Sequence, residues 1–73
     1  MHYLVTIYLG NECLMPQGEM TGTGLNELLK YMSSLNRDGR NAFMYELQNT
    51  GTATHIPEPD KKMQYSFAAV KKV

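Results

Sequence analysis

The sequence predicts an α+β domain, in which one antiparallel sheet of four to five strands packs a single helix on one face. Apolar and polar residues alternate near both ends of the chain, one stretch between them has helical periodicity, and turn-forming residues separate the segments. One amphipathic helix and a sheet with one apolar face are the minimum layers that enclose a core. The predicted order is β-β-α-β-(β)-β, and residues 1–73 are expected to form a single domain.

The first strand is predicted at residues 2–9, HYLVTIYL, because the segment is rich in β-branched and aromatic residues that alternate. The set expected to face the core is Tyr3, Val5, Ile7 and Leu9. Gly-Asn at 10–11 is a turn signal, so a short strand over 12–15 is expected to return as a hairpin. Pro16 confines that strand to an edge of the sheet or ends it.

The helix is predicted to follow a loop at 16–24, because the apolar spacing changes at Leu25. One stripe at helical spacing is formed by Leu25, Leu28, Leu29, Met32 and Leu35. Gly24 is the expected N-cap, with Thr23 as the alternative. The segment NRDGR at 36–40 is expected to end the helix in a turn.

Alternation returns after this turn and predicts the rest of the sheet. The expected segments are a strand at 41–49, a turn at 49–51, a short strand at 52–56, a polar connection at 57–62 and a strand at 63–70. The side chains expected to face the core are Phe43, Tyr45, Leu47, Met63, Tyr65, Phe67 and Ala69. The pattern does not determine the order of the strands that follow the helix.

Composition limits the function classes. Seven basic and seven acidic residues give a formal net charge of zero, which argues against strong binding to a phosphate backbone and against mimicry of DNA. The single cysteine allows no intrachain disulfide and fits a reducing, cytoplasmic location. The apolar start of the chain is too short for a membrane span. A chain of 73 residues has a marginal core, so self-association or partner binding is expected to stabilise it.

The glycine-rich stretch GEMTGTGLNELLKY, residues 18–31, does not match a nucleotide-binding loop. Gly22 and Gly24 match the first two glycines of a dinucleotide fingerprint, but Glu27 stands where the third is needed. The lysine of a Walker loop is also missing. A loop that starts a helix is the preferred interpretation, and no cofactor is expected.

No constellation of residues predicts catalysis or a metal site. Cys13 and His55 could serve as nucleophile and base, but no spacing connects them. Glu58 and Asp60 are two carboxylates without further oxygen ligands nearby in sequence. The chain is therefore expected not to be an enzyme.

The second face of the predicted sheet is more apolar than a solvated face requires, and it is the predicted protein interface. Its candidate contact residues are Leu4, Tyr8, Met44, Glu46 and Val70, with Thr6, Gln48, Ser66 and Ala68 among them. Scattered surface hydrophobic residues are the alternative interpretation.

Basic residues suggest a second candidate surface, for nucleic acid or an acidic partner. Its residues are Arg37, Arg40, Lys61 and Lys62. Acidic residues lie between them and no RNA-binding signature accompanies them, so charges that keep the protein in solution are the favoured interpretation.

We therefore expect a non-enzymatic protein-binding module. In size and manner the chain resembles small accessory proteins of phages and mobile elements, such as anti-CRISPR and anti-restriction inhibitors, which cover a functional surface of a host protein complex. No motif carries this resemblance. A small nucleic-acid-binding protein and a structural homodimer are the alternatives.

Overall fold

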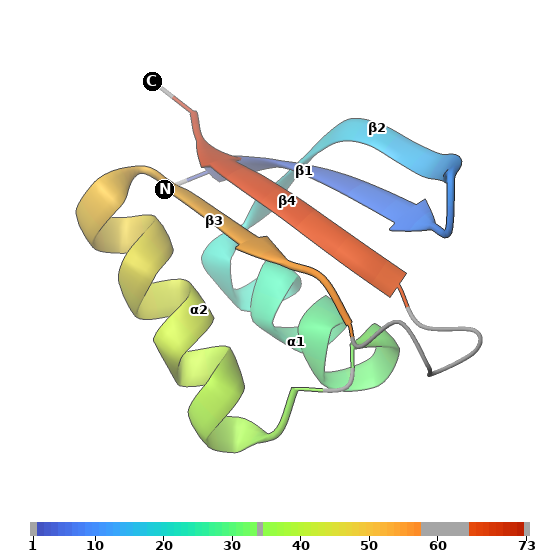
Figure 1. The fold of residues 1–73 in the computed structure, drawn as a ribbon. Helices are drawn as coiled ribbons and strands as arrows, with labels where there is room; N and C mark the ends of the chain where they lie inside the picture. Colours follow the sequence, from blue (N-terminus) through green and yellow to red (C-terminus); the bar gives the residue numbers. More distant parts are fainter. Residues whose placement is uncertain (1, 34, 58–64, 73) are drawn as a thin grey trace.

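The computed structural model describes residues 2–33, 35–57 and 65–72. In this part of the chain, four strands and two helices follow one another (Figure 1). In chain order they are β1 (His2–Leu9), β2 (Glu12–Thr21), α1 (Gly22–Met32), α2 (Arg37–Thr50), β3 (Thr52–His55) and β4 (Tyr65–Lys71).

The strands form one antiparallel sheet in the order β2-β1-β4-β3. The first and last strands are therefore the two central ones, and β2 and β3 are the edges. Both helices lie on the same side of the sheet, with α1 against β1 and β2 and α2 against β3 and β4 (Figure 1). The predicted α+β class, with an antiparallel sheet covered on one face, is confirmed.

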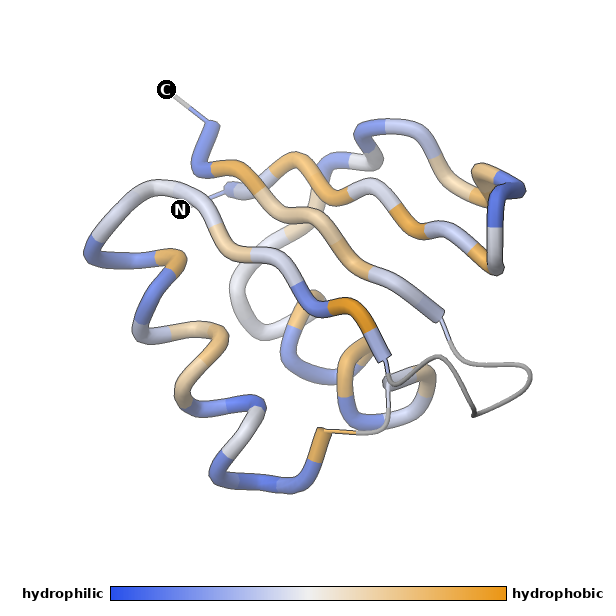
Figure 2. Tube along the Cα trace, viewed as in Figure 1, coloured by the Kyte–Doolittle hydropathy of each residue, from blue (hydrophilic) through white to orange (hydrophobic). Residues whose placement is uncertain are grey.

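The core lies between this sheet face and the helices. Its buried residues are Tyr3, Val5, Ile7, Leu25, Leu29, Phe43, Leu47, Ala53, Phe67 and Ala69. Hydrophobic residues run along the central strands and recur at intervals on both helices (Figure 2). The predicted inward set of β1 is confirmed at three of its four positions, since Leu9 at the end of the strand is only partly buried.

Strand β2 continues to Thr21, so the predicted loop over 16–24 is wrong for its first six residues. Because β2 is an edge strand, the missing N–H of Pro16 costs no sheet hydrogen bond. A bulge absorbs the irregularity: Gln17 has a φ of 45°, and its N–H donates to Thr6 Oγ1 at 3.3 Å. The glycine-rich stretch is thus strand followed directly by helix.

Helix α1 starts earlier than the apolar stripe indicates. Its N-cap is Thr21, whose Oγ1 accepts a hydrogen bond from Gly24 N–H at 3.1 Å, so the predicted caps Gly24 and Thr23 are both wrong. Gly22 lies close to the core, because a Cβ there would sit 3.4 Å from the Tyr3 ring. The glycines therefore belong to the first turn of a helix and not to a ligand-binding loop.

The predicted strand over 41–49 is wrong, because the segment belongs to helix α2. Phe43 and Leu47, four residues apart, are buried, whereas Tyr45 between them is 70% exposed. Asn36 begins the helix by accepting from Gly39 N–H at 2.8 Å, and Gly51 ends it with a φ of 87°. The residues predicted to be a turn at 36–40 are thus the start of a second helix.

The short strand predicted at 52–56 is confirmed as β3, and the last strand is confirmed as β4 from Tyr65 onward. Tyr65, Phe67 and Ala69 lie on the helix side, as predicted. Met63 and the predicted connection beyond Pro57 lie outside the described residues.

Replacement of the α1 cap tests the observed helix start. Thr21→Ala removes the acceptor of Gly24 N–H, and we expect a loss of about 1 kcal/mol of unfolding free energy in urea titrations. Thr23→Ala is the matched control and should change stability by less than about 0.5 kcal/mol. The reverse order of the two effects would place the cap at Thr23.

Truncations on α2 distinguish helix from strand. Leu47→Ala should cost about 2–5 kcal/mol, as much as the stability expected of a domain this small, whereas Tyr45→Ala should change it by less than about 0.5 kcal/mol. Thermal unfolding followed by circular dichroism measures both. Similar losses for the two variants would contradict the helical assignment.

Candidate functional site: the open face of the sheet

The face of the sheet that the helices leave uncovered, called the open face below, is built by the alternate residues of each strand. Since Tyr3, Val5 and Ile7 point to the core, the residues between them point the other way. On the central strands the open face comprises Leu4, Thr6, Tyr8, Ser66, Ala68 and Val70, and on the edge strands Cys13, Glu19, Thr52 and Thr54.

The pairing of β1 with β4 sets which of these residues are neighbours. Leu4 is directly opposite Val70, Thr6 is opposite Ala68, and Tyr8 is opposite Ser66. Leu4 and Val70 make an apolar pair, and Val70 is 51% exposed. The middle of the open face is occupied by the small side chains of Thr6 and Ala68. The larger side chains of Leu4 and Val70 lie toward one end of the face, and that of Tyr8 lies toward the other.

A hollow of about 350 Å³ lies on the open face near the β1–β2 turn. It is lined by Tyr8, Gly10, Asn11, Thr54, Ile56, Ser66, Phe67 and Ala68. Tyr8 is 38% exposed and Ile56, just beyond β3, is 75% exposed. The lining carries no charged side chain, so the hollow suits an uncharged, mainly apolar group.

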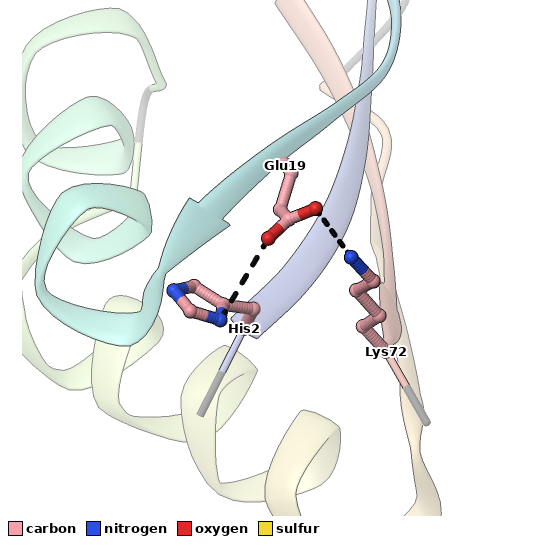
Figure 3. Close-up of polar contacts among 3 residues, drawn as sticks. All are labelled: His2, Glu19 and Lys72. Carbon is pink, nitrogen blue, oxygen red and sulfur yellow. Dashed lines mark hydrogen bonds and ion pairs between the residues drawn. The ribbon is translucent and has the colours of Figure 1, made fainter.

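Charged side chains of the described open face gather at the opposite end (Figure 3). Lys72 Nζ donates to Glu19 Oε1 at 2.6 Å, and His2 Nδ1 lies 3.7 Å from Glu19 Oε2. The hydrogen bond and charge of Lys72 lower the pKa of Glu19, with a smaller contribution from His2. Because all three side chains are about half exposed, the group contributes little to stability.

Each edge of the sheet is partly protected against the addition of a strand from another chain. The bond from Lys71 N–H to Gly51 C=O, 2.8 Å long, implies that Thr52 and Thr54 direct their backbone groups outward. Thr50 Oγ1 accepts from Thr52 N–H at 3.4 Å and lies 2.8 Å from the Thr52 carbonyl oxygen. At the other edge, Pro16 and the bulge at Gln17 interrupt β2. Contact through the open face is therefore favoured over strand addition.

Three of the five predicted interface residues, Leu4, Tyr8 and Val70, lie together on the open face. Met44 and Glu46 do not, because they belong to helix α2 on the other side of the sheet. Met44 lines a separate hollow of about 390 Å³ between the helices, together with Gly22, Thr23, Asn26, Asn41 and Gln48. Gln48, assigned to the same face by alternation, is therefore misplaced as well.

The predicted basic surface is only partly described. Arg37 and Arg40 lie in the first turns of α2, and Lys61 and Lys62 lie outside the described residues. Arg40 is partly buried and donates from Nη1 to the Leu35 carbonyl at 3.1 Å, so it supports the connection between the helices. Asp38 stands between the two arginines. Neither arginine lies on the open face.

Cys13 and His55 lie on opposite edge strands, with β1 and β4 between them. Cys13 is exposed on the open face, whereas His55 faces α2, where burial lowers its pKa. They therefore do not form a nucleophile–base pair. Within residues 2–33, 35–57 and 65–72, no three His, Cys, Asp or Glu side chains are grouped as a metal site would need. Neither described helix is long and apolar enough to cross a membrane.

Comparison with protein-family models, curated proteins and solved structures finds no significant match. The chemistry and geometry of the surface are therefore the basis for a functional proposal.

Sequence reasoning missed the residues that complete the hollow, Asn11, Thr54 and Ile56. They come from two segments, the β1–β2 turn and the end of β3, that only the strand order brings together. It also missed the group of His2, Glu19 and Lys72, because Glu19 belongs to the part of β2 that was predicted to be loop. The alternation of Thr52, Thr54 and Ile56 is a usable signal once β3 is placed beside β4.

A titration tests the electrostatics of this group. In the native chain, NMR should give Glu19 a pKa below its ordinary value of 4.5, because Lys72 stabilises the carboxylate. At pH values above 4.5, the ionised Glu19 is thus expected to make a small stabilising contribution to the fold. This contribution should disappear as the pH falls through the lowered pKa of Glu19.

Lys72→Met should move the pKa of Glu19 back toward 4.5. Lys71→Met removes the same charge one residue away, on the helix side of β4, and should have a much smaller effect. Equal effects of the two variants would show that the contact between Lys72 and Glu19 is not the cause.

Proposed function

We propose that this chain is a non-enzymatic protein-binding module whose contact surface is the open face. The observation that carries the proposal is the hollow between Tyr8 and Ile56, because it offers exposed apolar side chains in an uncharged, concave setting. Tyrosine is a residue type that often dominates binding energy when a partner covers it.

Three features support a surface that binds by shape. The face is a rigid sheet backed by a packed core, so binding would cost little ordering of the backbone. The charged side chains of the face are at one end, so a partner can exclude water from its centre without burying an unpaired charge. The bulge in β2 and the contact of Thr50 with Thr52 at β3 favour contact through the face over addition of a strand.

The specific form of the proposal is stoichiometric inhibition. A small module of this kind would act by covering a functional surface of a host protein complex, as an accessory protein of a phage or mobile element would. Formal neutrality over the whole chain favours occlusion of a protein surface over imitation of nucleic acid.

Affinity capture with matched variants tests the proposal. The immobilised native chain and Tyr45→Glu, whose changed residue is on α2, should retain the same protein from a host lysate. Tyr8→Glu should lose it, with at least about a 30-fold drop in affinity once the partner is purified. Equal retention by all three would contradict contact through the open face.

The same experiment distinguishes protein binding from the alternative function, nucleic-acid binding. Retention of DNA or RNA that falls steeply with salt, and that Arg37→Ala weakens while Tyr8→Glu does not, would favour that function over protein binding.

A further inference from the structure

The open face has a symmetry that fits a second copy of itself. In the order β2-β1-β4-β3, the line midway between β1 and β4 is the middle of the sheet. Consider a two-fold axis that runs parallel to the strands and lies above this line, on the open side of the sheet. It would place each β1 over the β4 of the second copy, and each β2 over the β3 of the second copy. The two open faces would then overlap along their full width, as in an aligned sandwich of sheets about 10 Å apart.

The β1–β4 register determines which residues meet across that axis. Because Tyr8 and Ser66 are directly opposite each other in the sheet, the axis places Tyr8 of each copy over Ser66 of the other. Ser66 lines the hollow, so the partly exposed Tyr8 ring of one copy would reach the hollow of the other. By the same operation Leu4 meets Val70, and Thr6 meets Ala68. The large Tyr8 side chain therefore meets the small Ser66, and the apolar Leu4 meets the apolar Val70.

The charges of the described open face stay at one end of this arrangement, where the same operation places Lys72 of each copy over His2 of the other. Glu19 is on β2, so the two copies of Glu19 would lie toward opposite margins of the dimer. Lys72 and His2 lie at the end of the face, and Lys72 is already hydrogen-bonded to Glu19 of its own copy. The contact would bury no lone charge at its centre, and the ion pair would stay at the rim, where polar groups are normal in interfaces.

The area of the face indicates the strength of the contact. Strand β1 has eight residues and the sheet four strands, which gives a face of about 26 Å by about 19 Å, or about 500 Å² in projection. Stable specific interfaces bury about 800 Å² per partner, and weaker transient ones bury less. The face is therefore large enough for a weak, concentration-dependent dimer and too small for an obligate one.

We propose that a second copy of this chain binds the open face, with Tyr8 of each copy seated in the hollow of the other. The inference rests on the proposed function, because it assigns an occupant to the same face. Self-association would cover the apolar hollow in the absence of another partner, and a binding partner would compete with the second copy. Dissociation of the dimer would then precede capture of that partner.

Sedimentation equilibrium of the purified chain, from micromolar to millimolar concentration, tests the inference. The native chain should show a reversible monomer–dimer equilibrium. Tyr8→Glu should weaken it by at least about 30-fold, and Tyr45→Glu should leave it unchanged. Ser66→Tyr, which fills the floor of the hollow, should weaken it as well. Circular dichroism should be used to check that each variant is folded. If Tyr8→Glu is unfolded, Ser66→Tyr provides the test instead.

Two results would overturn the inference: a native chain that stays monomeric at millimolar concentration, or a dimer that neither Tyr8→Glu nor Ser66→Tyr weakens. The first, combined with capture of a host protein that depends on Tyr8, would leave the proposed function standing. A dimer that depends on Tyr8 and Ser66, without any captured partner, would support the inference and contradict the proposed function.

Discussion

The pairing of the first strand with the last is the interaction on which the rest of the structure depends. The β1–β4 ladder runs from Tyr3 opposite Lys71 to Leu9 opposite Tyr65 and brings the two ends of the described chain together. On the helix side it presents Val5, Ile7, Phe67 and Ala69 to the core. On the other side the same register pairs Leu4 with Val70 and Tyr8 with Ser66. One ladder thus fixes both the core and the candidate binding face.

The uncovered face follows from the chain's path. Strand β2 is one edge and β3 is the other, so the segment between them must cross the whole sheet, and α1 and α2 make that crossing on one side (Figure 1). With both helices used on that side, no described element covers the opposite side. Hydrophobic residues of the central strands lie on both faces of the sheet, and the core uses those on the helix side. Tyr8, Val70 and Ile56 are apolar positions that this core does not use.

Local patterns predicted the elements whose period is unambiguous. Alternation over eight residues identified β1, and the stripe that includes Leu25 and Leu29 identified the body of α1. Phe43, Tyr45 and Leu47 misled because Phe43 and Leu47 are spaced both for a strand and for a helix, and only the caps Asn36 and Gly51 distinguish the two. Pro16 misled because a proline that would interrupt a central strand is tolerated at an edge.

The residues of the candidate site could be predicted only where the secondary structure was predicted correctly. Leu4, Tyr8 and Val70 could be assigned to one face because each lies on a correctly predicted strand, whose alternation decides the side. Met44 and Glu46 could not, because the error in secondary structure carried them to the wrong layer. Ile56 and Asn11 join the hollow only through the order of the strands, a long-range property that no local period contains.

The central claim is that the open face is the contact surface, and backbone amide NMR of the native chain during dilution tests it most directly. Dilution should shift amide signals of β1, β4 and the Gly10–Asn11 turn, while the outward sides of α1 and α2 stay constant. Shifts confined to the helices, or along the outer edge of β2 or β3, would contradict the claim. So would a spectrum independent of concentration that also stays unchanged when a captured partner is added.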